Sequence, residues 1–196
     1  MLRRHFVAWL VAIAALPKSV RAASQRVRMH LGGQRAIPSQ AAIRALGAAL
    51  LPNELGKART EIASDAFWRW MSGYREGAEL LHPYGSPRIS YTGASPVPAW
   101  TRQMDELDRA ARSEHGSGFA SLSANARQAL VRDALTDFKG DRLPGIVSAP
   151  HIALGMLAHF YDSSDATDLC YRAQIGRNKC RPLAHNARRP LPIALQ

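Results

Sequence analysis

Histidine side chains are the first candidates for chemistry in this sequence, because histidine is a common general base and metal ligand in proteins. Seven are present, and none stands in an H-x-x-x-H or H-E-x-x-H pattern. His151 and His159 are eight residues apart, which places them two turns apart on one helix. That spacing is too wide for both imidazoles to bind one metal ion. The seven histidines are His5, His30, His82, His115, His151, His159 and His185.

A pair of carboxylates near a histidine is the second arrangement that could do chemistry. Glu76, Glu79 and His82 recur at spacings of three, on one edge of a helix that continues through them. Carboxylate and imidazole groups together could bind a transition metal. However, Arg69 and Arg75 lie close enough to pair with these carboxylates, and such pairs are common on helix surfaces. We therefore expect this cluster to be structural.

Three aspartates at intervals of three, Asp162, Asp165 and Asp168, could supply oxygen ligands to a calcium ion. A calcium loop would also need a turn glycine and a following bidentate glutamate, and this stretch has neither. We predict instead that the aspartates cap a last helix. The sequence also lacks the G-x-S-x-G, G-x-G-x-x-G, P-loop and C-x-x-C-H patterns. It therefore predicts no catalytic, cofactor-binding or metal-binding residue in this chain.

The element that must position the Glu76 cluster is a helix predicted from about Arg59 to Leu81. Its apolar residues recur every three or four positions, as expected for one buried helix face. Pro83 disfavours helical angles at His82 and should end the helix there. The apolar positions are Ile62, Ala66, Trp70, Tyr74, Ala78 and Leu81.

From the end of this helix to Trp100 the chain is dense in glycine and proline, which predicts turns and not strands. The same stretch holds Tyr84, Ile89, Tyr91 and Val97. A disordered linker rarely contains so many aromatic and apolar residues. We expect a long ordered Gly/Pro/Tyr loop that lies over the helical core or against another protein.

Further helices are predicted on both sides of this loop. Ser39 should begin a helix that Pro52 ends, with Ile43 and Leu46 buried. A second amphipathic helix should run from about residue 98 to residue 113, with Trp100 on its apolar face.

Two more helix starts are predicted after residue 118. Ser123 should cap a helix whose buried face includes Leu130, Ala134 or Val131, and Phe138. Ser148 should cap a short helix with buried residues at Ile152, Met156, Leu157 and Phe160. No alternating strand pattern of useful length and no internal repeat is visible. We therefore predict an all-α fold, a small irregular domain of about five to six helices covering residues 23–196.

Positive charge is concentrated in two arms of the 196-residue chain, whose net charge is +11. Residues 1–35 hold seven Lys or Arg and residues 169–196 hold six, with no acid in either arm. The middle, residues 36–168, has a net charge of −2. Neither arm has a Lys/Arg-rich run, so we do not expect nucleic-acid binding. The C-terminal arm is expected to be a basic tail that is solvated or bound to a partner.

Residues 1–22 have the anatomy of a secretory signal peptide. Arg3 and Arg4 form a positive start, and the apolar run Phe6–Leu16 is too short to span a bilayer. The arginine pair just before Phe6 resembles a twin-arginine export signal. An ordinary secretory signal and an uncleaved anchor are the alternatives. All three place the mature chain outside the cytoplasm, and we expect the periplasm, with only indirect membrane association.

Cys170 and Cys180 are the two cysteines of the chain, and an oxidising compartment would allow them to pair. The loop between them is short, so the bond would contribute roughly 2–3 kcal/mol in the chain-entropy model. The alternative is two free thiols.

Four stretches, in order behind the leader, resemble a known family. They are LPNELG (51–56), YREGAELLHPYGSP (74–87), GFASLSANARQALV (118–131) and HFYDSSDATDLCY (159–171). Together they resemble the gluconate 2-dehydrogenase subunit 3 family, the small or gamma subunit of membrane-bound, flavin-dependent sugar and alcohol dehydrogenases. The resemblance spans roughly residues 38–185.

The resemblance implies a helical, non-catalytic subunit without a cofactor of its own. Such subunits bind a large FAD-containing catalytic subunit of the glucose-methanol-choline type, which often works with a multi-haem cytochrome subunit. The small subunit carries the twin-arginine signal, assists maturation of the large subunit and takes it across the membrane folded. No catalytic residue can be transferred from the family to this chain.

The helix end and the following loop are the predicted partner interface, because aromatic residues and arginine are enriched at subunit interfaces. Two other functions are alternatives: a free-standing exported helical binding module, and a small metal enzyme built on histidine and carboxylate residues. The predicted interface residues are Tyr74, Arg75, Glu76, Glu79, His82, Tyr84, Tyr91 and Trp100.

Overall fold

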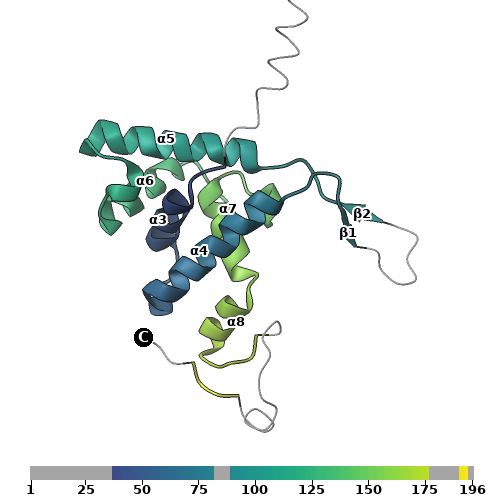
Figure 1. Ribbon diagram of the computed structural model, residues 1–196. Coiled ribbons are helices and arrows are strands. Elements are labelled where there is room, and N and C mark those ends of the chain that lie inside the picture. Colours follow the sequence, from purple (N-terminus) through teal and green to yellow (C-terminus); the bar gives the residue numbers. More distant parts are fainter. Residues whose placement is uncertain (1–36, 82–88, 177–189, 194–196) are drawn as a thin grey trace, which may run out of the picture. The chain divides into compact units, whose positions relative to one another are not determined.

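Six α-helices make up most of the described chain in the computed structural model, which describes residues 37–81, 89–176 and 190–193 (Figure 1). This confirms the all-α fold. The helices are α3 (Gln40–Leu50), α4 (Gly56–Gly73), α5 (Val97–His115), α6 (Ala124–Ala134), α7 (Ile152–Tyr161) and α8 (Ser164–Tyr171). Short 3-10 turns span Asn53–Leu55, Phe119–Ser121 and Ile146–Ser148, and two short strands, β1 (Glu79–Leu81) and β2 (Ser90–Tyr91), form a hairpin.

Local capping residues set the helix starts that the sequence predicted. The Ser39 hydroxyl accepts the N–H of Ala42 at 3.2 Å, and the Ser123 hydroxyl accepts the N–H of Ala126 at 3.3 Å. Each bond satisfies a backbone donor that has no partner within its own helix. α3 ends at Leu50, just before Pro52, as predicted.

The start of α7 differs from the prediction, because Ser148 belongs to a 3-10 turn and does not cap the helix. His151 is the capping residue, and its Nδ1 accepts the N–H of Ala153 at 3.2 Å. Gln103 of α5 also holds this end, since its side chain accepts from the N–H of Ile152 at 2.8 Å.

The aspartates before and within α8 do not form the cap that the sequence predicted. Ser163 begins the helix by accepting the N–H of Ala166 at 3.2 Å. Asp168 is buried and instead organises the chain after the helix. Its Oδ1 accepts the N–H groups of Ile175 and Gly176 at 2.7 and 2.6 Å.

The helix predicted to continue to Leu81 ends at Gly73 instead. Tyr74 is extended, with φ −60° and ψ 131°, and a turn follows at Gly77, where φ is +71°. β1 then pairs with β2 in antiparallel fashion, so part of the predicted loop is a small hairpin. The spacing of three between Glu76 and Glu79 therefore does not place them on one helix edge.

The core lies where α3, α4, α5 and α7 meet, and α7 is almost wholly buried in it. Two pairs of helices, α5 with α7 and α3 with α4, approach closely because glycine has no side chain. A Cβ on Gly155 of α7 would lie 2.5 Å from the ring of Trp100, and a Cβ on Gly47 of α3 would lie 1.9 Å from the hydroxyl of Ser64. The largest fully buried side chains include Trp100, Phe67, Phe119, Ile43, Leu46, Ile152 and Met156.

Several apolar residues do not lie where the helical period placed them. Ile62 is 60% exposed, because the buried face of α4 runs through Ser64, Phe67 and Met71 instead. Phe138 lies beyond the end of α6 and is 36% exposed. Within α6, Leu130 and Val131 are buried while Ala134 is exposed, which decides between the two predicted positions.

The described residues, which begin at Ile37, belong to one compact unit. None of the helices in the described ranges has the length and apolar character needed to cross a bilayer. Arg3, Arg4 and Phe6 lie outside the described residues, so the twin-arginine signal stays a prediction.

Candidate functional site

An aromatic cluster forms where the end of α4 meets α5 and α7. The ring of Phe67 lies 5.6 Å from that of Trp100 and 5.5 Å from that of His159, centroid to centroid. Trp70 contacts the same two rings at 5.9 and 6.3 Å. Tyr74 extends the cluster, with its ring 5.2 Å from that of Trp70. Aromatic pairs at such distances stabilise beyond their buried area, so the cluster fixes the end of α4 against the core.

A hollow of about 530 Å³ lies next to this cluster, between the end of α4 and the start of the hairpin. Trp70 and Tyr74 are only half-buried, so each forms part of the hollow's wall as well as part of the cluster. Most of the lining is apolar, while Arg69 and Arg75 place two positive charges at it. The lining also includes Gly73, Ala78, Thr92, Gly93 and Val147.

Hydrogen bonds hold the hairpin firmly to the end of α4. The Tyr74 hydroxyl donates to the carbonyl of Gly93 at 2.8 Å. The backbone of Thr92 accepts from the N–H of Gly77 at 3.0 Å, and its own N–H donates to the carbonyl of Ala78 at 2.8 Å. The Thr92 hydroxyl also donates to the carbonyl of Arg75. These bonds hold the hairpin edge of the hollow to the turn that follows α4.

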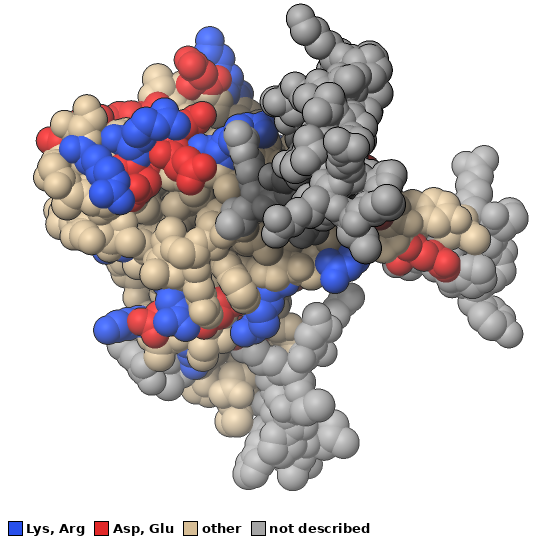
Figure 2. Space-filling model, turned by 45° about the horizontal axis from the view of Figure 1, so that its top comes forward, with Lys and Arg blue, Asp and Glu red and all other residues tan. Residues whose placement is uncertain are grey.

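The hairpin extends away from the helices (Figure 1). Apolar side chains of the hairpin are exposed to solvent. Tyr91 is 59% exposed, and Ile89 is also exposed. Val147, on the other side of the hollow, is 41% exposed. On the face of the helices shown in Figure 2, basic and acidic side chains are mixed and form no large patch of one sign. The exposed apolar residues around the hollow are therefore the feature that could bind a protein partner.

The structure brings some of the predicted interface residues together at this hollow. Tyr74 and Arg75 line it, and Tyr91 lies on the hairpin beside it. Glu76 is exposed in the connecting turn, where its carboxylate accepts the N–H of Ser95 at 3.2 Å. Glu79 is exposed at the start of β1. His82 and Tyr84 lie outside the described residues.

Trp100 is wrongly predicted as an interface residue, because it is only 1% exposed. It packs against Gly155, and its Nε1 donates to the carbonyl of Ala149 at 3.3 Å. The sequence pattern marked Trp100 as apolar and helical, which is correct, but an apolar helix face can bind the core or a partner equally well.

Trp70, Arg69 and Val147 line the hollow and are absent from the predicted interface. The helical period predicts Trp70 on the buried face of a longer helix, and it does not show that one side of this residue remains exposed. Val147 lies in a 3-10 turn far along the chain, and no local sequence signal connects that turn with the end of α4.

Burial changes the electrostatics of the site at His159. The surrounding rings lower the pKa of His159 below its ordinary value of 6.5, while the nearby carboxylate of Asp162 opposes the shift. No group of three or more His, Cys, Asp or Glu within the described ranges could hold a metal ion. Cys170 is exposed on α8, and Cys180 lies outside those ranges.

Comparisons with protein-family models, with curated proteins and with solved structures found no match to this chain.

Proposed function

We propose that this chain is the non-catalytic small (gamma) subunit of a flavin-dependent, membrane-bound dehydrogenase. In this role it binds the large catalytic subunit, assists its maturation and accompanies it during export. The proposal rests on the sequence resemblance and on one structural observation: an apolar hollow beside a protruding hairpin. FAD then belongs to the large subunit, and this chain needs no cofactor of its own.

The shape of the site suits a partner side chain. Hot spots of protein interfaces are commonly large aromatic or aliphatic side chains that fill preformed pockets. The hollow between Trp70, Tyr74 and Val147 is present without a partner, and hydrogen bonds hold its hairpin edge to the turn after α4. Exposed Tyr91 on the hairpin would in turn bury its ring against the partner.

The charges at the hollow suit an acidic rim on the partner. Arg69 and Arg75 line it, and guanidinium groups form bidentate pairs with carboxylates. The only hydrogen bond that the described residues show for the Arg75 guanidinium is to the carbonyl of Tyr74, at 3.2 Å. Apolar contacts would then supply affinity, and the arginines would select partners with acidic residues near the inserted side chain.

The same proposal includes the cellular location of the complex and one further subunit. The mature complex is periplasmic, at the outer surface of the inner membrane, and its membrane contact is made through other subunits. A multi-haem cytochrome subunit is a further partner and would accept the electrons that the flavin releases.

Co-purification of the full chain with the flavoprotein tests the proposal. Tagged protein from its natural host should carry a large subunit that shows flavin absorbance and dehydrogenase activity. Replacing Val147 with Asp places a charge in the hollow and should release this subunit. Leu143→Asp is the matched control, because Leu143 is also 41% exposed but does not line the hollow.

Tyr91→Ala gives a second, less disruptive measurement. Loss of an interface anchor of this size should cost about 2 kcal/mol or more of binding free energy. Tyr171→Ala is its control, since Tyr171 is 70% exposed on α8, well apart from the hairpin (Figure 1). Isolation of the chain without a flavin subunit, or equal loss of binding in variant and control, would refute the proposal.

A further inference from the structure

The two strands of the hairpin differ in how well their outer edges are protected from pairing with another chain. A free strand edge presents N–H and C=O groups that can bind a further strand. β1 has a register irregularity between Glu79 and Leu81 and an exposed charge at Glu79, and both features hinder such pairing. β2 and its neighbours read Ile-Ser-Tyr-Thr (89–92), without a charged residue or a proline. The edge of β2 is therefore the one that is open to a further strand.

The hydrogen bonds of the hairpin show which way the backbone of Tyr91 faces. The N–H of Thr92 donates to the carbonyl of Ala78 at 2.8 Å. This bond makes Glu79 and Tyr91, which lie opposite each other, a pair without mutual backbone hydrogen bonds. The N–H and C=O of Tyr91 therefore point away from β1. Within the described ranges the sheet has only these two strands, so no strand lies beside the outer edge of β2 there.

The side chains along this edge suit strand pairing, and the edge leads to the hollow. Tyr91 and Ile89 are exposed, and aromatic and β-branched residues are enriched in strands. Gly93, two residues after Tyr91, lines the hollow together with Thr92. Since a strand advances about 3.3 Å per residue, a strand added beside Tyr91 would reach the hollow within two or three residues.

The charges at the hollow indicate the chemistry of the added strand. Arg69 and Arg75 are exposed and line the hollow, and none of the described residues in its lining is a carboxylate. An acidic residue on the added strand would match these charges. A second copy of β2 would not, because residues 89–92 contain no acid. Charge complementarity therefore favours a different protein over self-association.

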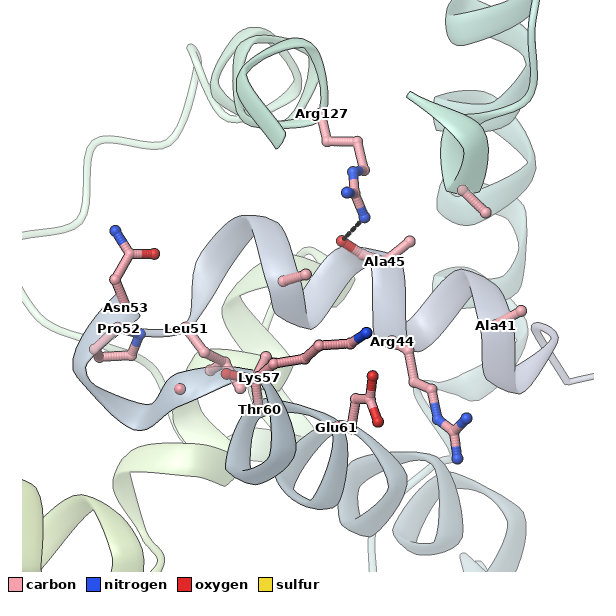
Figure 3. A pocket seen from close by; sticks show the side chains of 13 residues that line it. Ala41, Arg44, Ala45, Leu51, Pro52, Asn53, Lys57, Thr60, Glu61 and Arg127 are labelled. Atoms are coloured by element: carbon pink, nitrogen blue, oxygen red, sulfur yellow. Dashed lines mark hydrogen bonds between the residues drawn. The ribbon is translucent and has the colours of Figure 1, made fainter. Parts of the chain in front are cut away.

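Another concave region of the fold offers helix surfaces and no strand edge. It lies among α3, the start of α4 and α6, and shares no lining residue with the hollow (Figure 3). Two of its arginines are bonded within the fold. Arg127 donates to the carbonyl of Ala45 at 3.0 Å, and Arg44 pairs with Asp65 at 2.7 Å. Lys57 is exposed in this groove and provides a control position away from the hairpin.

We infer that an extended segment of the flavoprotein adds a third strand to the hairpin at the edge of β2. Its backbone pairs with the N–H and C=O of Tyr91, an apolar side chain enters the hollow, and an acidic residue pairs with Arg69 or Arg75. Such strand addition is a recurring mode of peptide recognition, in which the main chain gives affinity and alternate side chains give specificity. The inference rests on the proposed function, since it says how the same hollow recognises the large subunit.

Hydrogen exchange tests the backbone contact in the complex purified from the natural host. The amide of Tyr91 points outward in the isolated chain, so its exchange should slow by about tenfold or more in the complex. The amide of Thr92 is already bonded to Ala78 and should change less. Exchange is read by NMR on this chain after quenching and separation from the flavoprotein. An unchanged rate at Tyr91 in the complex would overturn the inference.

Proline at position 91 removes the same N–H. Tyr91→Pro should bind the flavoprotein about three- to tenfold more weakly than Tyr91→Ala, because both variants lack the ring and only proline lacks the donor. Proline is tolerated on an edge strand where the missing N–H faces outward, so the two melting temperatures should be similar. Lys57→Ala is the control and should bind as the unmodified chain does. Equal affinity of Tyr91→Pro and Tyr91→Ala would show that the partner does not use this edge.

The outcomes separate this inference from the proposed function. If the flavoprotein co-purifies but the Tyr91 amide exchanges as in the isolated chain, the added strand is refuted and the proposed function stands. If no flavoprotein co-purifies, both are refuted. Sedimentation of the isolated chain tests the other occupant: a dimer that protects the Tyr91 amide would assign the edge to a second copy and refute the flavoprotein segment. If Tyr91→Pro does not fold, hydrogen exchange of the unmodified complex decides.

Discussion

At the scale of single residues, one ion pair makes the stability of the folded protein depend on pH in the acid range. Asp65 of α4 accepts two hydrogen bonds from Arg44 of α3, which lower the pKa of its carboxyl from 3.8 to about 2, while desolvation opposes the shift. Because the pKa is lower in the folded state, the pair stabilises the fold above about pH 4. That contribution is lost as the pH falls from about 4 to 2.

Asp65→Asn should therefore lower the free energy of unfolding at pH 7 by no more than about 1 kcal/mol, because the pair is partly exposed. The difference between the variant and the unmodified protein should shrink as the pH falls below about 4. Urea unfolding of both proteins at several pH values measures this difference in the free energy of unfolding. Asp105→Asn, the same substitution on the exposed face of α5, is the control. A constant difference for Asp65→Asn across this range would contradict the assignment.

His151 makes the stability of the folded protein depend on pH in a second, higher range. Burial lowers the pKa of its imidazole below 6.5, although the carboxylate of Glu106 acts in the opposite direction. Its Nδ1 can accept the N–H of Ala153 only while that nitrogen carries no proton. Since the folded-state pKa lies below the unfolded one, the stabilisation is complete above about pH 6.5 and declines as the pH falls.

His151→Asn should reduce this decline, because asparagine also caps helices but does not titrate in this range. The pH dependence of stability between about pH 6.5 and 5 should become shallower, as followed by thermal unfolding. Part of the decline should remain, since burial also lowers the pKa of His159. His115→Asn, at the exposed end of α5, is the control. An unchanged slope in His151→Asn would show that the cap does not depend on protonation.

At the scale of elements, the sequence predicted those boundaries that depend on neighbouring residues. Ser39, Pro52 and Ser123 act on backbone groups within a few positions, so their effects on α3 and α6 could be predicted. α5 is also close to its prediction, running from Val97 to His115, with Gly116 in the left-handed region after it.

The end of α4 could not be predicted in the same way. Residues 74, 78 and 81 continue the helical period, yet the backbone there turns to pair with Thr92. The end of the helix at this point depends on contacts across the hairpin and on the positive φ of Gly77. The period of the apolar residues describes neither of these. The hollow was only partly predicted for the same reason, because Val147 joins Trp70 and Tyr74 through the tertiary fold.

The crossing of α3 and α4 depends on the small size of two residues. A Cβ on Gly47 would lie 1.9 Å from the Ser64 hydroxyl, which is buried and donates to the carbonyl of Thr60 at 2.7 Å. Gly47→Ala should therefore destabilise the protein by about 1–3 kcal/mol, despite the better helix propensity of alanine.

Combining Gly47→Ala with Ser64→Ala should cost less than the sum of the two single changes, because the clashing oxygen is removed. The free energy of unfolding is measured with denaturant for four proteins: the unmodified chain, the two single variants and the double variant. Gly73→Ala serves as the control, since no atom lies within 4 Å of a Cβ there. Strict additivity of Gly47→Ala and Ser64→Ala would mean that the helices separate and do not touch at this point.

At the scale of the whole molecule, the predicted bond between Cys170 and Cys180 would tie α8 to the basic C-terminal arm. Cys170 is exposed on α8, so its thiol is accessible for pairing. Mass spectrometry of the unreduced, alkylated protein should show neither cysteine alkylated. Reduction should then lower the free energy of unfolding by roughly 2–3 kcal/mol in the chain-entropy model. Two alkylated thiols in the unreduced sample would show that the bond does not form.

The position of α7 along the chain determines when folding can be completed. α7 fills the centre of the core, yet it ends at Tyr161, late in the sequence. About 140 residues separate the predicted leader, residues 1–22, from the end of α7. The ribosome takes about 7–28 s to synthesise this length at roughly 5–20 residues per second. During this time α3 and α4 leave the ribosome without the helix that covers them. The export signal that we predict would therefore be exposed to its receptor many seconds before there is a folded protein to carry.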